Sequence, residues 1–313
     1  MLKRVTIKNF RCFRHLQTEL QPLTVLIGPN DSGKSTFLGA LERLATNLGW
    51  SNLDHWRMNP EAELVISADT SEGSVRVQVP GTAVVRWPAP ELQPVGFFRL
   101  PCHGVPMESQ GYPDVEGPQP IAWDGSGVPS LLDYLLRRDR PRFFAVAKAL
   151  QSLIPGLDEL EIATPTPDRR RLDLVIEKGV RIPADQASAG VRLLLFFVAL
   201  AYHPSPPRLI LLEEPENGIH PKRLADVIRL LREVTRGEHG GQAAQVILTT
   251  HSPFLVDHVD LDQDQVLVFQ RKEDGSRTAE PVDASRLKTF LDEFMLGEVW
   301  FNQEEEGLVA QQT

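Results

Sequence analysis

The sequence predicts an α/β fold, and three apolar stretches carry that prediction. Residues 23–27 form an apolar run that enters a glycine-rich loop and then a helical pattern. Residues 209–212 and 246–248 form two more apolar runs, with an amphipathic helical pattern at 224–234 between them. Short buried strands that alternate with helices are typical of a sheet covered by helices. At 313 residues the chain is long enough to bury a full core.

The composition is that of an ordinary globular protein, with 42% hydrophobic and 24% charged residues. The net charge of −9 argues against a generally basic nucleic-acid-binding protein, so any contact with DNA needs a local basic patch. Two arginine-rich clusters, at 137–142 and 169–171, are candidates. A solvated face is the favoured interpretation of each cluster, and DNA binding is the alternative.

The sequence favours a location in the cytoplasm. Its two cysteines, Cys12 and Cys102, are isolated and show no metal-ligand spacing, which suits a reducing compartment. The N-terminus lacks the apolar core of a signal peptide, and the most apolar run, residues 191–202, is too short to span a bilayer. We therefore expect no membrane association.

The N-terminal part of the chain predicts an antiparallel β subdomain. Residues 2–8 alternate in hydrophobicity, and residues 15–20 are expected to pair with them. Residues 63–68 and 74–79 predict a second hairpin, and proline-rich loops follow it.

A small helical lobe is predicted within residues 128–160, and the whole chain, residues 1–313, is predicted to be a single unit that contains it. The helix that starts at Ser188 is apolar nearly all round and is therefore expected to be buried. The first helix is expected to run from the glycine-rich loop to Gly49. The remaining predicted elements are, in order, helices at 131–136 and 143–154, strands at 95–100, 160–163 and 172–177, a hairpin from 265, a helix at 286–295 and a frayed polar tail at 303–313.

The first motif follows the strand at 23–27 and fits the phosphate-binding pattern G-x-x-x-x-G-K-[ST] from Gly28 to Ser35. A strand before the loop and a helix after it are the context that this motif requires, because loop amides and the helix N-terminus together attract an anion. Lys34 would bridge the β- and γ-phosphates, and Ser35 would bind Mg²⁺. A glycine-rich turn before an ordinary helix is the alternative, which the flanking elements disfavour. The residues expected to bind the nucleotide here are Asn30, Asp31, Ser32, Gly33, Lys34, Ser35 and Thr36.

The second motif is a pair of carboxylates, Glu213 and Glu214, at the end of the strand at 209–212. The carboxyl end of a central strand faces the ligand crevice in an α/β sheet, so Glu213 is placed to bind Mg²⁺ and Glu214 to polarise an attacking water. His251 follows the strand at 246–248 and would reach the same edge, as a hydrogen-bond donor to the γ-phosphate or to the water. A solvated acidic turn and a structural histidine are the alternatives.

The third motif is Ala187-Ser188-Ala189-Gly190, directly before the buried helix. Ser188 predicts an N-cap, and Gly190 allows a close approach of the backbone. A helix N-terminus with a hydroxyl and a bare glycine backbone is also a second anion site. Two phosphate sites in one chain suggest one nucleotide held between two copies.

Taken in this order, the motifs resemble those of ABC-type ATPase heads of the AAA family, and most closely the soluble RecF/SMC/OLD-like branch. The opening residues 7–11 resemble the first strand and turn of that branch, and residues 28–36 resemble its Walker A element. The signature element, Walker B, D-loop and switch histidine would correspond to residues 187–190, 209–214, 216–220 and His251. The resemblance implies a P-loop NTPase fold of ABC-ATPase type with a mostly parallel core sheet.

The same resemblance implies a head-to-tail homodimer that closes around ATP and Mg²⁺, with Ser188 and Gly190 of one copy facing Walker A of the other. Departures from the family pattern are Ala187 in place of Leu, Ala189 in place of Gly and Glu213 where Asp is commoner. No Q-loop glutamine and no adenine-binding aromatic residue can be assigned. Gln78 and Gln110 are weak candidates for the first role, and Phe10 and Phe13 for the second.

We therefore expect an ATPase that hydrolyses ATP to ADP and phosphate, as a stand-alone head without a coiled coil or nuclease domain. Its partners are expected to be DNA or a separately encoded effector, in DNA repair or antiviral defence, and this setting rests on family analogy alone. Two alternatives are the nucleotide-binding subunit of a membrane transporter and a nucleotide-gated assembly module with little hydrolysis. ATP-dependent binding to DNA rather than to membranes would distinguish the expected ATPase from a transporter subunit. A turnover rate that depends on Glu214 would distinguish it from an assembly module.

Overall fold

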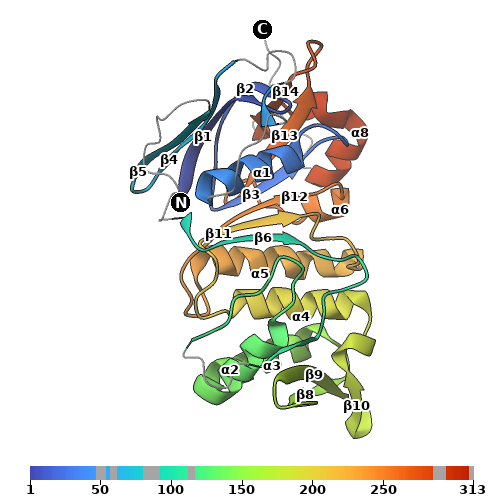
Figure 1. The fold of residues 1–313 in the computed structure, drawn as a ribbon. Helices are drawn as coiled ribbons and strands as arrows, with labels where there is room; N and C mark the ends of the chain where they lie inside the picture. The colour runs from blue at the N-terminus through green and yellow to red at the C-terminus, as the bar shows by residue number, and fades with distance from the viewer. Residues whose placement is uncertain (47–53, 57–61, 80–91, 112–116, 285–293, 310–313) are drawn as a thin grey trace. The chain divides into compact units, whose positions relative to one another are not determined.

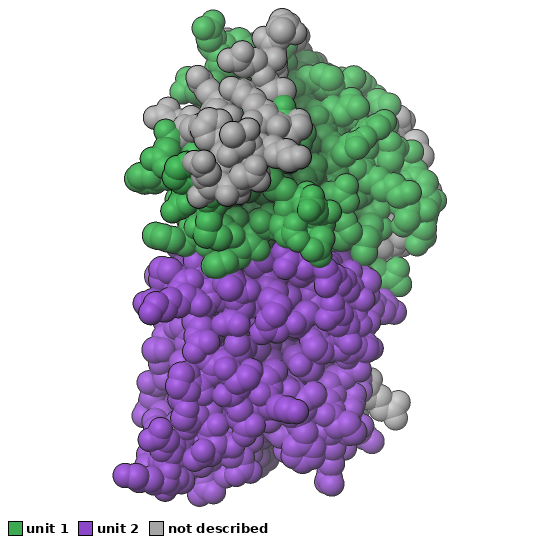
Figure 2. Space-filling view, turned by 180° about the vertical axis from the view of Figure 1, so that it is seen from behind, with its two compact units in different colours: residues 1–97, 207–214, 245–313 green, residues 98–206, 215–244 purple. Residues whose placement is uncertain are grey.

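The computed structural model describes residues 1–46, 54–56, 62–79, 92–111, 117–284 and 294–309. The chain divides into two compact units (Figure 2). Unit 1 contains residues 1–97, 207–214 and 245–313, and unit 2 contains residues 98–206 and 215–244. The two units are described separately below. The predicted single unit with a helical lobe inside it stays a prediction.

A six-stranded sheet forms the centre of unit 1, in the order β14-β13-β3-β12-β11-β6 (Figure 1). Strands β13, β3, β12 and β11 run parallel, and β14 runs antiparallel to β13. The predicted mostly parallel core sheet is therefore confirmed. The strands are β3 (Leu23–Ile27), β6 (Val95–Arg99), β11 (Leu209–Glu213), β12 (Gln245–Thr249), β13 (Gln265–Arg271) and β14 (Arg277–Pro281). The first three residues of β6 belong to unit 1.

A second, antiparallel sheet of unit 1 has the order β2-β1-β4-β5 and confirms the predicted N-terminal β subdomain. Helix α1 (Lys34–Ala45) shares one core with this sheet, because Phe37 and Leu41 pack in the same buried cluster as Val5 and Ile7. The predicted helix end at Gly49 lies outside the described residues. The strands of this sheet are β1 (Leu2–Phe10), β2 (Phe13–Glu19), β4 (Leu64–Thr70) and β5 (Gly73–Val79).

The described part of unit 1 also contains the helices α6 (Pro253–Val256) and α8 (Leu296–Leu308). The predicted helix at 286–295 falls mostly on residues outside the described ranges. The predicted frayed tail is wrong for residues 303–308, because they continue α8, and Leu308 is fully buried.

In the residues of unit 2 that the structure describes, four longer helices accompany a small antiparallel sheet. The predicted helices at 131–136 and 143–154 are confirmed as α2 and α3, and the predicted helix from Ser188 is confirmed as α4. The helices are α2 (Val128–Arg138), α3 (Arg140–Leu153), α4 (Ala189–Ala201) and α5 (Leu224–Arg236). The strands are β7 (Glu108–Gln110), β8 (Leu157–Ala163), β9 (Arg169–Ile176) and β10 (Val180–Pro183), and β9 pairs with each of the other three.

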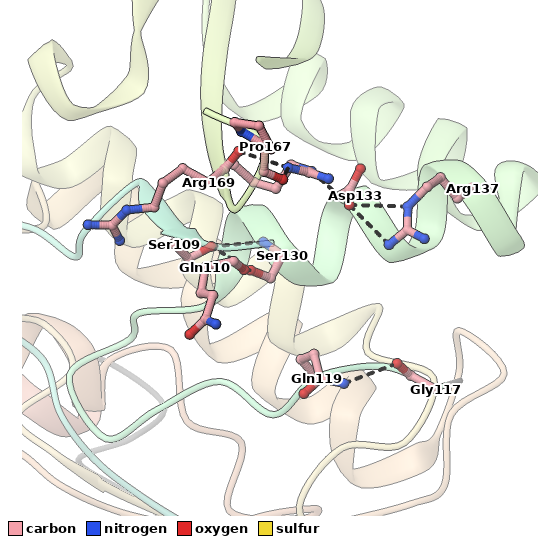
Figure 3. Close-up of polar contacts among 10 residues, drawn as sticks. Ser109, Gln110, Gly117, Gln119, Ser130, Asp133, Arg137, Pro167 and Arg169 are labelled. Carbon is pink, nitrogen blue, oxygen red and sulfur yellow. Dashed lines mark hydrogen bonds and ion pairs between the residues drawn. The ribbon is translucent and has the colours of Figure 1, made fainter. Parts of the chain in front are cut away.

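The arginine-rich clusters of unit 2 are partly internal ion pairs. Arg170 is buried, and its Nε donates to Asp133 Oδ2 at 3.1 Å. Asp133 also accepts from Arg137, and Figure 3 shows these two side chains pointing toward each other. Arg171 binds Asp173 through two hydrogen bonds of 2.7 and 2.8 Å. Arg170 is an internal ion-pair residue, so the favoured interpretation of the cluster at 169–171 as a solvated face is wrong for this residue.

Among the described residues, no helix combines the length and the apolarity that a bilayer crossing would require.

Candidate functional site

The site of unit 1 begins with the register of three neighbouring strands. Leu26 of β3 lies beside Thr249 of β12, and Thr249 lies beside Glu213 of β11. Because these strands are parallel and in step, the loops that follow them leave the sheet at the same edge. The structure thus brings together the glycine-rich loop, the two carboxylates and the His251 segment, as the sequence predicts.

The glycine-rich loop requires glycine at two positions. Gly28 has φ 134° and Gly33 has φ 103°, both in a region that side chains disfavour. A Cβ at Gly28 would overlap with the carbonyl oxygen of Phe269, and one at Gly33 would meet Cys12 Sγ at 3.0 Å. The loop therefore lies tightly against β13 and the turn between β1 and β2, which fixes its path.

The interior of this loop fits an anion. Lys34, only 5% exposed, donates through Nζ to the carbonyl oxygens of Gly28 at 2.8 Å and Pro29 at 2.9 Å. The hydroxyl of Ser32 is buried and has no hydrogen-bond partner within the described residues. A buried hydroxyl without a partner costs free energy, and a phosphate oxygen is a partner that would satisfy it. The ammonium group, the free hydroxyl and the start of α1 together suit phosphate.

The two residues expected to act on water lie next to each other. His251 Nε2 is 3.6 Å from Glu214 Oε1, and both side chains are partly exposed. Burial and the positive charge of Lys34 lower the pKa of His251, against the opposite effect of Glu214. His251 is therefore predominantly neutral at neutral pH and keeps one N–H to donate.

The backbone of Glu214 is held in an unusual conformation. Its φ is 44°, in the left-handed region, and its N–H donates to Thr249, to the carbonyl oxygen at 3.1 Å and to Oγ1 at 3.2 Å. Such conformations cost about 1 kcal/mol or more and persist where surrounding contacts hold them. Thr249, which is buried, thus positions the Glu214 backbone at the end of β11.

One hydroxyl group and one carboxylate group are available here as ligands for a magnesium ion. Ser35 is exposed on the first turn of α1, and Glu213 is half-buried at the end of β11. The described residues contain no group of three or more side chains of the types that bind metals. This donor set suits Mg²⁺, which takes one or two protein ligands and completes its shell with phosphate oxygens and water.

The motif at 187–190 belongs to unit 2. Ser188 is exposed and caps α4, with its Oγ accepting from the N–H of Val191 at 3.3 Å. A Cβ at Gly190 would approach the carbonyl oxygen of Gly218 at 3.2 Å. The predicted N-cap and the predicted close approach at Gly190 are therefore confirmed. The Gly218 carbonyl that Gly190 approaches belongs to the segment at 216–220, which is part of the same unit.

The structure excludes both aromatic candidates for the adenine base. Phe10 and Phe13 are fully buried in the core of unit 1, so neither offers a ring face to a nucleotide. Their proposed role is wrong. Periodicity did not indicate this outcome, because Phe10 is out of phase with the alternation of Val5 and Ile7, and the backbone of Asn9 before it has a φ of 54°.

The sequence did not reveal Arg277, which contacts the glycine-rich loop from β14. Its Nη2 lies 2.9 Å from Asp31 Oδ2, and its Nε donates to the Asp31 carbonyl oxygen at 2.8 Å. No motif links these residues, which are 246 positions apart in the sequence. The one available signal is an arginine at the start of a short strand, which is too common to single out.

Comparison with known proteins places the motifs in a wider context. Residues 128–257 match the family described as "AAA domain, putative AbiEii toxin, Type IV TA system", and residues 1–77 match the AAA ATPase domain family. An OLD nuclease of Thermus scotoductus is 24% identical, in an alignment that covers 95% of this chain and 68% of the relative.

Solved structures share the fold at low sequence identity. The SMC head bound to the C-winged helix domain of ScpA has a TM-score of 0.61 at 12% identity, covering 92% of this chain and 99% of that one. An SMC head with an extended coiled coil, bound to the C-terminal domain of ScpA derived from Pyrococcus furiosus, has a TM-score of 0.55 at 12% identity and covers 93% and 98%. These similarities concern the fold.

Proposed function

Because this chain is a P-loop ATPase of the ABC/AAA type, related to RecF, SMC and OLD proteins, we propose that it hydrolyses ATP in a closed, head-to-tail homodimer. The observation that carries the proposal is the meeting of three loops at one edge of the sheet, with Lys34, Glu214 and His251 on them. Such an arrangement combines a phosphate cradle with groups that act on water.

In the proposed reaction, the loop amides and Lys34 bind the phosphates and offset their negative charge. Ser35 and Glu213 would hold Mg²⁺, which would supply further charge neutralisation at the phosphate oxygens. Glu214 orients the attacking water and accepts its proton, while His251 donates a hydrogen bond from its neutral ring. The left-handed backbone of Glu214, held by Thr249, keeps the carboxylate next to His251.

We assign Ser188 and Gly190 to the nucleotide of the partner copy. Ser188 is exposed, and the N-terminus of α4 beside it carries a partial positive charge that favours phosphate. A nucleotide that contacts Lys34 of one copy and Ser188 of the other would hold the dimer closed. Hydrolysis would then remove the contact with the γ-phosphate and open it.

A mixing experiment tests whether the two motifs act in different copies. Lys34→Ala and Ser188→Arg variants are each expected to be inactive alone. In a 1:1 mixture, half of the dimers combine one copy of each variant and contain one intact site, so activity returns to about a quarter of the wild-type rate. No recovery in the mixture, although wild type is active, would assign Ser188 to the site of its own copy.

A second experiment tests the closed dimer directly. Glu214→Gln should bind ATP and hydrolyse it slowly, because the amide cannot accept the proton of the water. The variant with Mg-ATP should therefore elute as a dimer in gel filtration, and Lys34→Ala should not. Elution of Glu214→Gln as a monomer would contradict the dimer.

We also propose that the cycle acts in the cytoplasm on DNA or on a separately encoded effector. Similarity to an OLD nuclease and to SMC heads bound to ScpA domains supports a partner of this kind. ATP-dependent retention of the Glu214→Gln variant on DNA, measured against the same variant with ADP, tests the DNA alternative. Retention that is equal with both nucleotides would contradict coupling of DNA binding to the cycle.

A further inference from the structure

Arg277 makes an unusual set of contacts for a residue outside the known motifs. Its guanidinium is buried, and it holds both the carbonyl oxygen of Asp31, at 2.8 Å from Nε, and the carboxylate of Asp31, at 2.9 Å from Nη2. Arginine offers its donors in a rigid planar fork, so two bonds to one residue fix orientation as well as distance. Arg277 therefore determines how Asp31 is presented in the loop.

Asp31 needs such support because of its backbone. Its φ is 62°, in the left-handed region, where a residue with a side chain is less stable than glycine. The side chain of Asp31 is 89% exposed, so its own packing contributes little to this conformation. The bonds from Arg277 are the contacts that the structure provides to hold it.

The orientation of Asp31 also sets the direction of the next amide. In a trans peptide the C=O and N–H groups point to opposite sides. With the Asp31 carbonyl directed to Arg277, the N–H of Ser32 is directed away from Arg277. That N–H makes a bond of 3.3 Å to the Pro29 carbonyl, which is longer than an ordinary N–H···O bond and which a phosphate oxygen could replace.

Arg277 is itself fixed from two sides. Its backbone N–H donates to the carbonyl oxygen of Cys12 at 3.1 Å, in the turn between β1 and β2. Its Nη1 donates to the carbonyl oxygen of Gly275 at 2.6 Å, in the turn between β13 and β14. With its backbone bonded to one turn and its guanidinium bonded to another, Arg277 has little freedom left to lose when nucleotide binds, which favours preorganisation.

We propose that Arg277 is a positioning residue of the nucleotide site, which holds the Asp31–Ser32 peptide in the orientation that receives phosphate. This inference rests on the proposed function, because it assumes that the loop binds ATP. Arg277 acts through Asp31 and takes no part in the chemical step. Its loss should therefore weaken nucleotide binding more than it slows turnover at saturation.

The test compares Arg277→Ala and Arg277→Lys with wild type in Mg-ATP affinity, KM and kcat. Arg277→Ala should raise the Kd and KM about tenfold or more, while kcat at saturating ATP changes less than about threefold. Lysine keeps the charge and one donor direction but loses the fork, so Arg277→Lys should recover only part of the affinity. Arg271→Ala is the matched control, because Arg271 lies opposite Arg277 in the strand register and is exposed.

Asp31→Gly provides an independent measurement. Glycine adopts the left-handed backbone without strain and removes the carboxylate. The loop conformation in this variant therefore depends less on Arg277. In the Asp31→Gly background, Arg277→Ala should weaken ATP binding by a smaller factor than in wild type. Equal factors in both backgrounds, or equal losses from Arg271→Ala and Arg277→Ala, would overturn the inference.

The outcomes separate this inference from the proposed function. Wild type that neither binds nor hydrolyses ATP would refute the proposed function. Active wild type with an unchanged KM in Arg277→Ala would refute only the positioning role. Thermal unfolding of each variant shows whether the fold is kept. If Arg277→Ala does not fold, the comparison of Arg277→Lys with wild type and of Asp31→Gly with Asp31→Gly/Arg277→Lys decides the question.

Discussion

The Nε2 atom of His251 lies 3.6 Å from the Oε1 atom of Glu214, across the ends of two neighbouring parallel strands. The pair brings a hydrogen-bond donor and a proton acceptor to one place, although 37 positions separate the two residues in the sequence (251 − 214). Since burial and Lys34 lower the pKa of the imidazole, the pair is a neutral donor beside a carboxylate rather than a fixed ion pair.

His251→Ala should reduce kcat by about a hundredfold and change the KM for ATP little, because the lost hydrogen bond is made to the reacting groups. Steady-state turnover over a range of ATP concentrations measures both constants. His15→Ala, at an exposed position of β2, is the control. A large rise in KM with an unchanged kcat would place His251 in binding rather than in the chemical step.

Gly28→Ala should destabilise the protein by about 3 kcal/mol or more, because the new Cβ meets the Phe269 carbonyl and the backbone φ is unfavourable for alanine. Gly39→Ala is the matched control: Gly39 lies in α1, and its nearest neighbour would be an ordinary 3.7 Å away. There the substitution should stabilise by about 0.5–1 kcal/mol. Urea unfolding measures both, and similar values for the two variants would contradict the tight path of the loop.

His203 should make stability depend on pH. Burial lowers its pKa from 6.5 to about 4, while its Nδ1 accepts from the N–H of Ser205 and its Nε2 donates to the Gln119 carbonyl. Between these two values the unfolded chain binds the proton more strongly than the folded one, so the free energy of unfolding falls as the pH falls from 6.5 towards 4. The share from this residue is up to about 3 kcal/mol.

Unfolding by urea at several pH values checks this expectation. In His203→Gln the slope of stability between pH 6.5 and 4 should be smaller, because glutamine does not titrate. His15→Gln, at an exposed position of β2, is the control variant. An unchanged slope in His203→Gln would show that other groups cause the pH dependence.

Asp133→Ala should lower the free energy of unfolding by about 3 kcal/mol, because the buried charge of Arg170 loses its carboxylate. Asp158→Ala, which removes an exposed carboxylate of the same unit, should change it by less than about 0.5 kcal/mol. The double variant Asp133→Leu/Arg170→Met should recover much of the loss, since no unpaired buried charge remains. Failure to recover would indicate that the pair has a role beyond charge compensation.

Local patterns predicted most of the fold. The three core strands are short apolar runs, and the helices of unit 2 follow regular spacing, so periodicity located them within a few residues. Strands β7 and β10 were missed, because three or four residues are too few to show a period. The end of α8 was missed because residues 303–306 are polar or acidic, a composition that local patterns assign to a solvated tail.

The candidate site, like the fold, could be predicted only in part from the sequence. The sequence located Lys34, Glu214 and His251, because each lies at a fixed distance from an apolar strand. It could not locate the hydrogen bonds from Arg277 to Asp31, because they depend on β14, which joins the sheet beside β13. Nor could it reveal that Asp133 is buried, since a carboxylate in an amphipathic helix is ordinarily assigned to solvent.

The chain passes between its two units four times, and one passage falls directly after Glu214, the last residue of its segment of unit 1. Neither unit is a continuous piece of sequence, so neither can be exchanged with a relative as a cassette or expressed by simple truncation. Recombination that improves one unit must splice at several points, one of them beside Glu214, the residue proposed to orient the attacking water. We expect successful chimaeras of this ATPase to be rare for that reason.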